Sequence, residues 1–137
     1  VRSLPPELLR KGRFDQMFWV DLPTASEREQ ILSASLKQFK REKGINLSAL
    51  TEKTEGWVGA EIASIVPEAM FTAFNDGARQ ITTEDLLLAA ESVVPLSVTM
   101  GEKLGEIRKF MEGKSLNASR PEKATKAKSR KEVLDLD

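Results

Sequence analysis

One strand-like segment in a chain that otherwise has helical periodicity limits the fold more than any other sequence feature. Residues 16–21 (QMFWVD) are rich in bulky apolar side chains and precede Leu22 and Pro23, which predicts a short strand that ends before the proline. From residue 24 onward, apolar residues recur every three or four positions instead. A lone strand cannot pair its own backbone groups. We therefore expect a mostly α-helical chain whose strand needs partners from a larger sheet.

The expected helices combine helical apolar spacing with capping or stopping residues, one before the strand and about five after it. They cover residues 5–11, 24–43, 48–54, 60–75, 83–94 and 100–113. Two capping boxes fit the second helix equally well, Thr24 with Glu27 and Ser26 with Glu29. Ser48 is expected to cap the next helix.

The helix expected at residues 60–75 contains a proline, Pro67. Proline removes one backbone hydrogen bond, so we expect it to kink or divide the helix. The apolar stripe of this helix is predicted to be Ile62, Ile65, Val66, Ala69, Met70 and Phe74. The aromatic residues Trp57, Phe71, Phe74 and Phe110 are interpreted as packing residues of a core or an exposed interface, not as a ligand-binding set.

Composition excludes several kinds of chemistry. The chain has neither cysteine nor histidine, which removes thiol catalysis, structural zinc and histidine-dependent triads, and no metal ligands are predicted. The 21 basic and 21 acidic residues balance, so charge indicates no nucleic-acid or membrane partner. No apolar run approaches the roughly 20 residues that cross a bilayer. Because the chain begins with Val1 and has no leader pattern, we expect a start in mid-domain.

The string LPPELLRKGRFD at residues 4–15 carries the strongest chemical signal. Arg10 and Arg13 stand on either side of Gly12, a residue at which helices commonly stop. Two guanidinium groups held this close can bind a phosphate. The alternative is that they only interact with the negative end of the helix dipole.

This string resembles the end of the second region of homology of AAA ATPases. The matching residues are Leu8, Leu9, Arg10, Gly12, Arg13, Phe14 and Asp15. Farther along, residues 27–32 (EREQIL) resemble the first helix of the AAA lid, and residues 54–62 (TEGWVGAEI) resemble its sensor-2 segment. The resemblance covers about residues 3–113, and residues 94–111 resemble an uncharacterised bacterial and plastid branch of the family.

The resemblance implies roles for several residues. Arg10 and Arg13 would be arginine fingers that act on the nucleotide of a neighbouring subunit, which implies a homo-oligomeric ring, a hexamer. Asp15 would orient the turn. Glycine permits close approach of a ligand to the backbone. Gly59 and Ala60 would accordingly lie against adenine and ribose.

Two residues of the first lid helix are candidates for the same site. Ile31 would pack on the base, although a plain core role fits it equally well. Ser35 stands where family members often have a histidine, so this polar contact departs from the pattern.

The cofactor implied is ATP. The sequence contains no GxxxxGK[ST] loop and no apolar strand that ends in paired acids, so magnesium would be held by a separate P-loop half. We therefore expect no ATP hydrolysis by this chain alone, and its enzyme status depends on the parent ATPase. The client protein is not indicated.

The predicted organisation has four parts: residues 1–23 end an α/β nucleotide-binding core, 24–96 form the helical lid, 97–113 form a C-terminal helix and 114–137 form a disordered tail. Cytoplasm or plastid stroma is the expected compartment. One alternative is a non-catalytic helical module of lid fold that binds a protein. Another is nucleic-acid binding through the basic residues 120–131.

Overall fold

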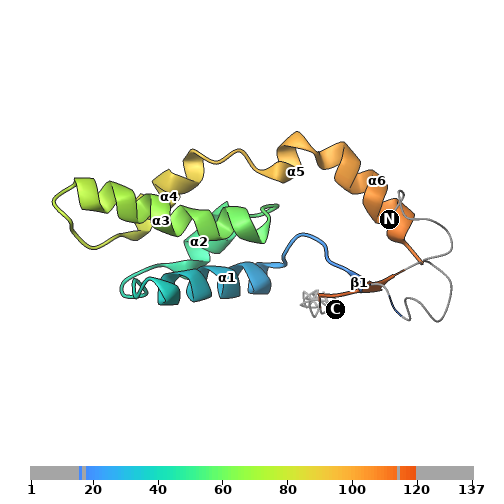
Figure 1. Ribbon diagram of the computed structural model, residues 1–137, viewed down its shortest axis with the longest axis horizontal. Helices are drawn as coiled ribbons and strands as arrows, with labels where there is room; N and C mark the ends of the chain where they lie inside the picture. Colours follow the sequence, from blue (N-terminus) through green and yellow to red (C-terminus); the bar gives the residue numbers. More distant parts are fainter. Residues whose placement is uncertain (1–15, 17, 114, 120–137) are drawn as a thin grey trace, which may run out of the picture.

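The computed structural model describes residue 16, residues 18–113 and residues 115–119 of the chain. Its elements are strand β1 (Phe18–Trp19), helices α1 (Ala25–Gln38), α2 (Leu47–Lys53), α3 (Gly59–Asn75), α4 (Thr83–Glu91), α5 (Leu96–Thr99) and α6 (Gly101–Met111), and strand β2 (Leu116–Asn117). Helices α1 to α4 form a bundle, and α5 and α6 lead away from it toward the strands (Figure 1). The predicted mostly α-helical class is confirmed. The helix expected at residues 5–11 lies outside the described residues.

The core lies where α3 packs against α1 and α4. Its fully buried large side chains come from all four bundle helices: Leu32, Leu36, Leu50, Ile62, Ile65, Val66 and Leu86. Trp57 joins them from the α2–α3 loop and is 4% exposed. Burial of such apolar surface is the main force that holds the bundle together.

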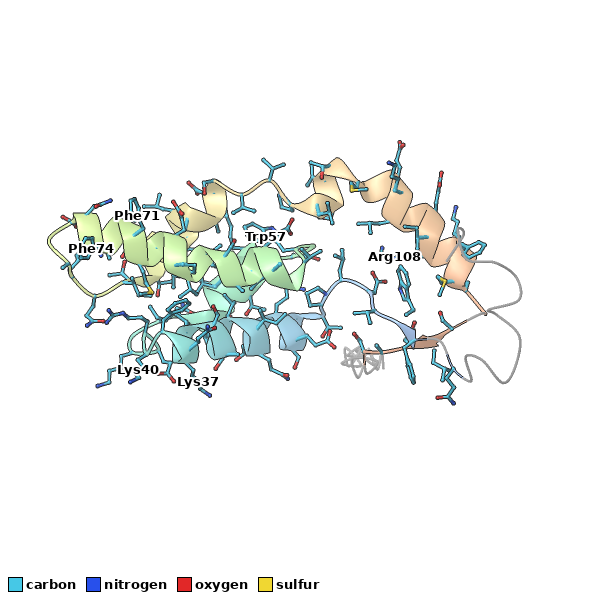
Figure 2. All side chains as sticks on the ribbon, in the orientation of Figure 1. Lys37, Lys40, Trp57, Phe71, Phe74 and Arg108 are labelled. Carbon is cyan, nitrogen blue, oxygen red and sulfur yellow. The ribbon has the colours of Figure 1, made fainter. Side chains whose placement is uncertain are left out.

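The inward stripe of α3 differs from the prediction at its end. Ala73 is buried, whereas Phe71 and Phe74 are 64% and 70% exposed. Both phenylalanines lie at the end of α3 that is farther from the strands (Figure 2). The predicted inward position of Phe74 is wrong because Ala73 continues the i, i+4 spacing from Ala69, which turns Phe74 away from the core.

The start of α1 selects one of the two capping boxes. Glu27 N donates to Thr24 Oγ1 at 3.3 Å, and Thr24 N donates to Glu27 Oε2 at 2.9 Å. The Thr24–Glu27 box is therefore the one that forms, with Thr24 in the extended conformation that a capping residue adopts.

The end of α1 comes earlier than residue 43. Lys40 adopts a left-handed conformation with φ of 56°. Its N–H donates to Lys37 O, and Arg41 N–H donates to Leu36 O, at 3.0 and 2.9 Å. This pair of bonds is a Schellman motif, which stops a helix and usually has glycine at the left-handed position. The sequence prediction relied on Gly44 and missed a lysine in this role.

Helix α2 is capped by Asn46, so the prediction that Ser48 caps it is wrong. Asn46 Oδ1 accepts a hydrogen bond from Ala49 N at 3.3 Å. In addition, Asn46 N donates to Thr83 Oγ1 at 3.0 Å, which joins the start of α2 to the start of α4. Ser48 already lies inside the helix, where it cannot cap.

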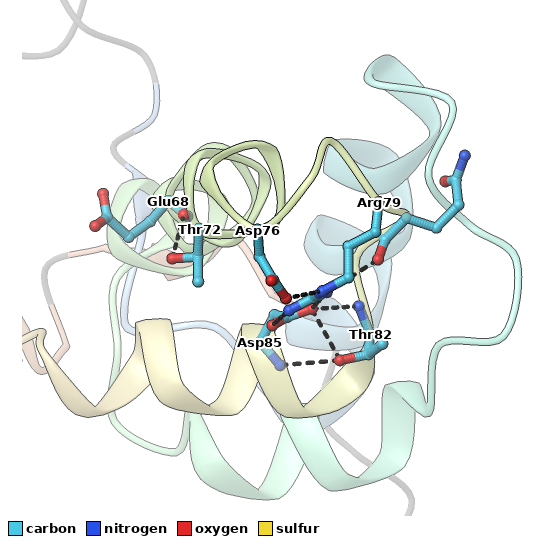
Figure 3. Close-up of polar contacts among 7 residues, drawn as sticks. Glu68, Thr72, Asp76, Arg79, Thr82 and Asp85 are labelled. Atoms are coloured by element: carbon cyan, nitrogen blue, oxygen red, sulfur yellow. Dashed lines mark hydrogen bonds and ion pairs between the residues drawn. The ribbon is translucent and has the colours of Figure 1, made fainter.

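An ion-pair network fixes the turn between α3 and α4 (Figure 3). Arg79 donates to both carboxylate oxygens of Asp85, at 2.6 and 2.8 Å, and to Asp76 Oδ2 at 2.6 Å. Asp85 Oδ2 also accepts from the backbone N–H and hydroxyl of Thr82, which caps α4. Hydrogen bonds from Arg79 lower the pKa of Asp85 despite its burial. This carboxylate therefore caps a helix and pairs a cation at once.

The C-terminal part returns to the first strand. Phe18 pairs with Leu116 and Trp19 with Asn117 in a parallel two-stranded sheet. Arg108 on α6 makes a two-pronged ion pair with Asp21, with Nε to Oδ2 at 2.8 Å and Nη2 to Oδ1 at 2.7 Å. The sequence predicted a tail without structure from residue 114. Instead, β2 lies within that range, while residues 120–137 lie outside the described residues.

Candidate functional site

A cavity of about 470 Å³ lies between the first turns of α1, the segment after β1 and the start of α3. Its lining residues are Val20, Asp21, Pro23, Glu27, Gln30, Ile31, Ala34, Gly59 and Ser119. The volume falls within the range of about 300–1,000 Å³ that is typical of small-molecule sites.

One face of α1 forms a wall of this cavity. Glu27, Gln30, Ile31 and Ala34 are spaced i, i+3, i+4 and i+7, so they share a side of the helix. The opposite side carries the buried residues Arg28, Leu32, Ser35 and Leu36. Helix α1 therefore has one face for the core and one for the cavity.

Ile31 and Gly59 lie side by side in the wall of the cavity. A Cβ atom placed on Gly59 would lie 3.5 Å from Ile31 Cδ1, which is ordinary van der Waals contact. Gly59 carries no side chain, and the apolar side chain of Ile31 stands beside its backbone. Such a surface can accept a flat, apolar ring face.

The other residues predicted for this site are placed differently. Ala60 follows Gly59 in the first turn of α3 and is exposed, and it is not among the lining residues. Ser35 is 7% exposed and faces the core, where its hydroxyl donates to Ala63 O at 3.3 Å. The expected fingers Arg10 and Arg13 lie outside the described residues.

The hydrogen bond of Ser35 explains the continuity of α3 through Pro67. A proline lacks the N–H that would bind the carbonyl four residues earlier, and that carbonyl belongs to Ala63. Ser35 supplies a replacement donor from α1. Of the two expected effects, a kink or a division, the division does not occur, and α3 runs unbroken from Gly59 to Asn75.

Sequence reasoning missed the polar rim of the cavity, which consists of Asp21, Glu27 and Ser119. Hydrogen bonds from the Thr24 backbone and from Ser119 lower the pKa of Glu27. Burial raises the pKa of Asp21, but hydrogen bonds from Arg108, the Leu22 backbone and Trp19 outweigh it and lower that pKa overall. Both carboxylates are therefore ionised at neutral pH, and Arg108 balances the charge of Asp21. A signal for Glu27 was present, since its capping box turns it toward Thr24, one helical turn before Ile31.

The start of α3 is joined to α5 by Glu61. Its Oε2 accepts from Val58 N at 2.9 Å and its Oε1 from Leu96 N at 2.8 Å. These bonds fix the loop that presents Gly59 to the cavity.

A second cavity of about 460 Å³ lies between the end of α6 and the two strands. Trp19, Asp21, Arg108 and Met111 are among its lining residues. Because Arg108 is already paired with Asp21, this cavity offers less free charge than its lining implies.

Within the described part of the chain, no cluster of three or more acidic side chains is placed to hold a metal ion. The described helices also include none with the length and apolarity to span a bilayer.

Comparison with known proteins identifies the class. Residues 44–88, which include α2, α3 and the first turns of α4, match the family of the AAA+ lid domain. The chain belongs to the AAA family and carries its lid.

Individual relatives sharpen this assignment. The chain is 40% identical over 109 residues to the uncharacterized AAA domain-containing protein ycf46 of Guillardia theta, a match that covers 78% of this chain and 21% of that protein. It is 41% identical over 93 residues to the proteasome-activating nucleotidase of Saccharolobus solfataricus, covering 68% of this chain and 24% of that protein. The chain thus spans about a fifth to a quarter of these relatives.

A solved structure shows the same fold. The crystal structure of the FIGL-1 AAA domain in complex with ADP matches with a TM-score of 0.62 at 22% identity, over 80% of this chain and 42% of that one. The predicted membership of the AAA family is confirmed by these matches and by the lid.

Proposed function

We propose that this chain is the arginine-finger and lid portion of a AAA ATPase, which binds and hydrolyses ATP together with a P-loop half. The observation that carries this proposal is the cavity in which Ile31 and Gly59 meet. Family membership adds that the lid belongs to a nucleotide-binding class of protein.

In this proposal adenine lies against the surface that the Ile31 side chain and the Gly59 backbone form together, with Ala60 near the ribose. Ser35 is left out of the contact because its hydroxyl is engaged with Ala63 O. ATP would supply the base that fills the cavity, and its magnesium ion would be held by the P-loop half. The residues fit the base because they offer an apolar wall and a backbone without a side chain.

Arg10 and Arg13 act in the site of the next subunit. Phosphoryl transfer spreads negative charge over the transferred group, and an arginine aimed at that charge accelerates the reaction by about 10³–10⁵. This role requires a ring, which we take to be a homo-hexamer. We place the ring in the cytoplasm or the plastid stroma.

The finger assignment is tested in the AAA protein that contains this chain. Arg10→Ala with Arg13→Ala should lower the ATPase rate by about a thousandfold, while Lys11→Ala, which removes the intervening charge, should leave the rate nearly unchanged. Mixing the finger variant with a subunit whose P-loop is inactive should restore part of the rate, because each then completes the other's site. Full activity of the double variant would falsify the assignment.

A second candidate function is a non-catalytic module that binds a protein through the lid. The exposed Phe71 and Phe74 on α3 favour it, because two large apolar side chains on one exposed helix end often mark an interface. Phe71→Ser with Phe74→Ser would then abolish partner binding without changing nucleotide binding. Loss of nucleotide binding in Ile31→Asp would instead support the ATPase.

A further inference from the structure

The segment 115–119 reaches the candidate nucleotide pocket from far along the chain. Strand β2 pairs in parallel with β1, and Ala118 N continues the pairing by donating to Trp19 O at 2.9 Å. The ion pair between Arg108 and Asp21 holds α6, the helix that precedes β2, against the residues that follow β1. Backbone and side-chain contacts thus fix the position of residue 119.

Ser119 lies on the rim of the cavity that Ile31 and Gly59 line. It is half-buried, and its hydroxyl donates to Glu27 Oε2 at 3.1 Å, although the two residues are 92 positions apart. With Ser119 in place the cavity still measures about 470 Å³. Ser119 is therefore part of the cavity wall and not a plug.

The hydrogen bond to Glu27 also fixes how Ser119 faces a ligand. A serine hydroxyl has one hydrogen and two lone pairs. Glu27 accepts the hydrogen, so only the lone pairs of the oxygen remain for a ligand. A ligand group that donates a hydrogen bond is favoured at this point, and one that only accepts is not.

We propose that Ser119, held by β2 and Glu27, is a specificity-determining residue that accepts a hydrogen bond from the exocyclic amine of adenine. This inference rests on the proposed function, since it needs the base in this cavity. It adds that Ser119, which β2 brings to the cavity, forms a third side of the site.

The test uses the 137-residue chain, ¹⁵N-labelled and titrated with adenosine or inosine while amide signals are followed by NMR. Inosine replaces the amine with a carbonyl oxygen, and NMR detects the weak binding expected without a phosphate site. Amide signals of Ile31, Gly59 and Ser119 should move together. Adenosine should bind about three to ten times more tightly than inosine, the factor for one hydrogen bond.

Three variants test the Ser119 hydroxyl and the strand pairing that positions it separately. Ser119→Ala should lose the preference for adenosine while the signals of Ile31 and Gly59 still move. Ala118→Pro removes the N–H that donates to Trp19 O and should have the same effect by releasing the segment. Ala118→Val keeps that N–H and should behave like the original chain.

The outcomes distinguish the two proposals. If Ile31 and Gly59 respond but Ser119→Ala keeps the full preference for adenosine, the role of Ser119 is wrong and the base pocket stands. If neither Ile31 nor Gly59 responds to either nucleoside, the base pocket fails, and the role of Ser119 fails with it. Unchanged signals of the core residues Leu50 and Ile62 show that each variant is folded. If Ala118→Pro is not folded, the result for Ser119→Ala alone tests the role of Ser119.

Discussion

The hydroxyl of Ser35 on α1 donates to the carbonyl oxygen of Ala63 on α3, 3.3 Å away, where the chain has no backbone donor to offer. Pro67 leaves the Ala63 carbonyl without a backbone donor, because it follows Ala63 by four residues and has no N–H. One side chain thus lets a proline stand inside a continuous helix. It also takes Ser35 away from the nucleotide contact that family resemblance implied.

Replacing Ser35 with alanine should destabilise the fold. The Ala63 carbonyl would lose its partner in a partly buried place, at a cost of about 1 kcal/mol in the free energy of unfolding. In a Pro67→Ala background the cost should nearly vanish, because an alanine at this position restores the backbone donor. Urea denaturation of the two single variants and the double variant measures this coupling.

Ser33→Ala is the matched control, since it lies in the same helix and is not fully buried. Ser33→Ala raises helix propensity by the same amount as Ser35→Ala. The difference between the two variants in the free energy of unfolding therefore excludes this contribution. Equal effects of Ser35→Ala with and without Pro67 would contradict the compensation.

Acid should weaken the fold through Asp85. Hydrogen bonds from Arg79 and Thr82 lower the pKa of this carboxyl in the folded state. Its stabilising contribution is therefore complete above the unfolded pKa of about 4 and is lost as the pH falls from about 4 through the lowered value. The free energy of unfolding, measured by denaturation at several pH values, should fall across this window.

Asp85→Asn should lower stability at neutral pH by about 1–3 kcal/mol, because it removes the charge of a buried carboxylate that accepts hydrogen bonds from Arg79 and Thr82. It should also flatten the acid dependence. Glu84→Gln is the control, since Glu84 is an exposed acid in the first turn of the same helix. The assignment to Asp85 fails if both variants keep the same pH profile as the original chain.

The Arg108–Asp21 pair should matter more for the position of α6 than for overall stability. Both side chains are partly exposed, at 46% and 35%, so Arg108→Gln should cost only about 0.2–1 kcal/mol. Amide hydrogen exchange in β2 should nevertheless accelerate, because α6 leads directly into that strand. Lys109→Gln removes a neighbouring exposed charge and should leave exchange in β2 unchanged.

Truncation of an aromatic side chain should lower the free energy of unfolding strongly at Trp57 and hardly at all at Phe74. Trp57 is 4% exposed, and Trp57→Ala should cost about 3–5 kcal/mol. Phe74 is 70% exposed, and Phe74→Ser should change the free energy of unfolding by no more than about 0.5 kcal/mol. Thermal unfolding of the two variants separates them. A large loss in Phe74→Ser would mean that this side chain is buried in solution.

Much of the fold could be predicted from local pattern. The apolar spacing around Ile62 and Ile65 places α3 to within one residue at its start, because an amphipathic helix buries a continuous stripe. The Thr24 capping box was one of two that fit. The end of α1 was missed, since Lys40 reaches a left-handed conformation that its residue type does not favour.

The candidate site could be predicted only in part. Resemblance to a family named Ile31 and Gly59, and the structure brings the two residues to one cavity, while their contact with a nucleotide stays a prediction. Ser119 could not be found, because its place depends on a strand pairing with a segment at the other end of the chain. Nothing in its immediate sequence differs from that of an ordinary polar tail.

The helical class and most of the apolar faces follow from the sequence alone, since these depend on residues within a few positions of each other. Where side chains such as Ser35 and Ser119 find their partners depends on the packing of distant elements. The reason is physical: a backbone carbonyl left open by Pro67, or a rim carboxylate at Glu27, accepts whichever donor the packing brings near. The spacing of residues along the chain does not predict which donor that will be.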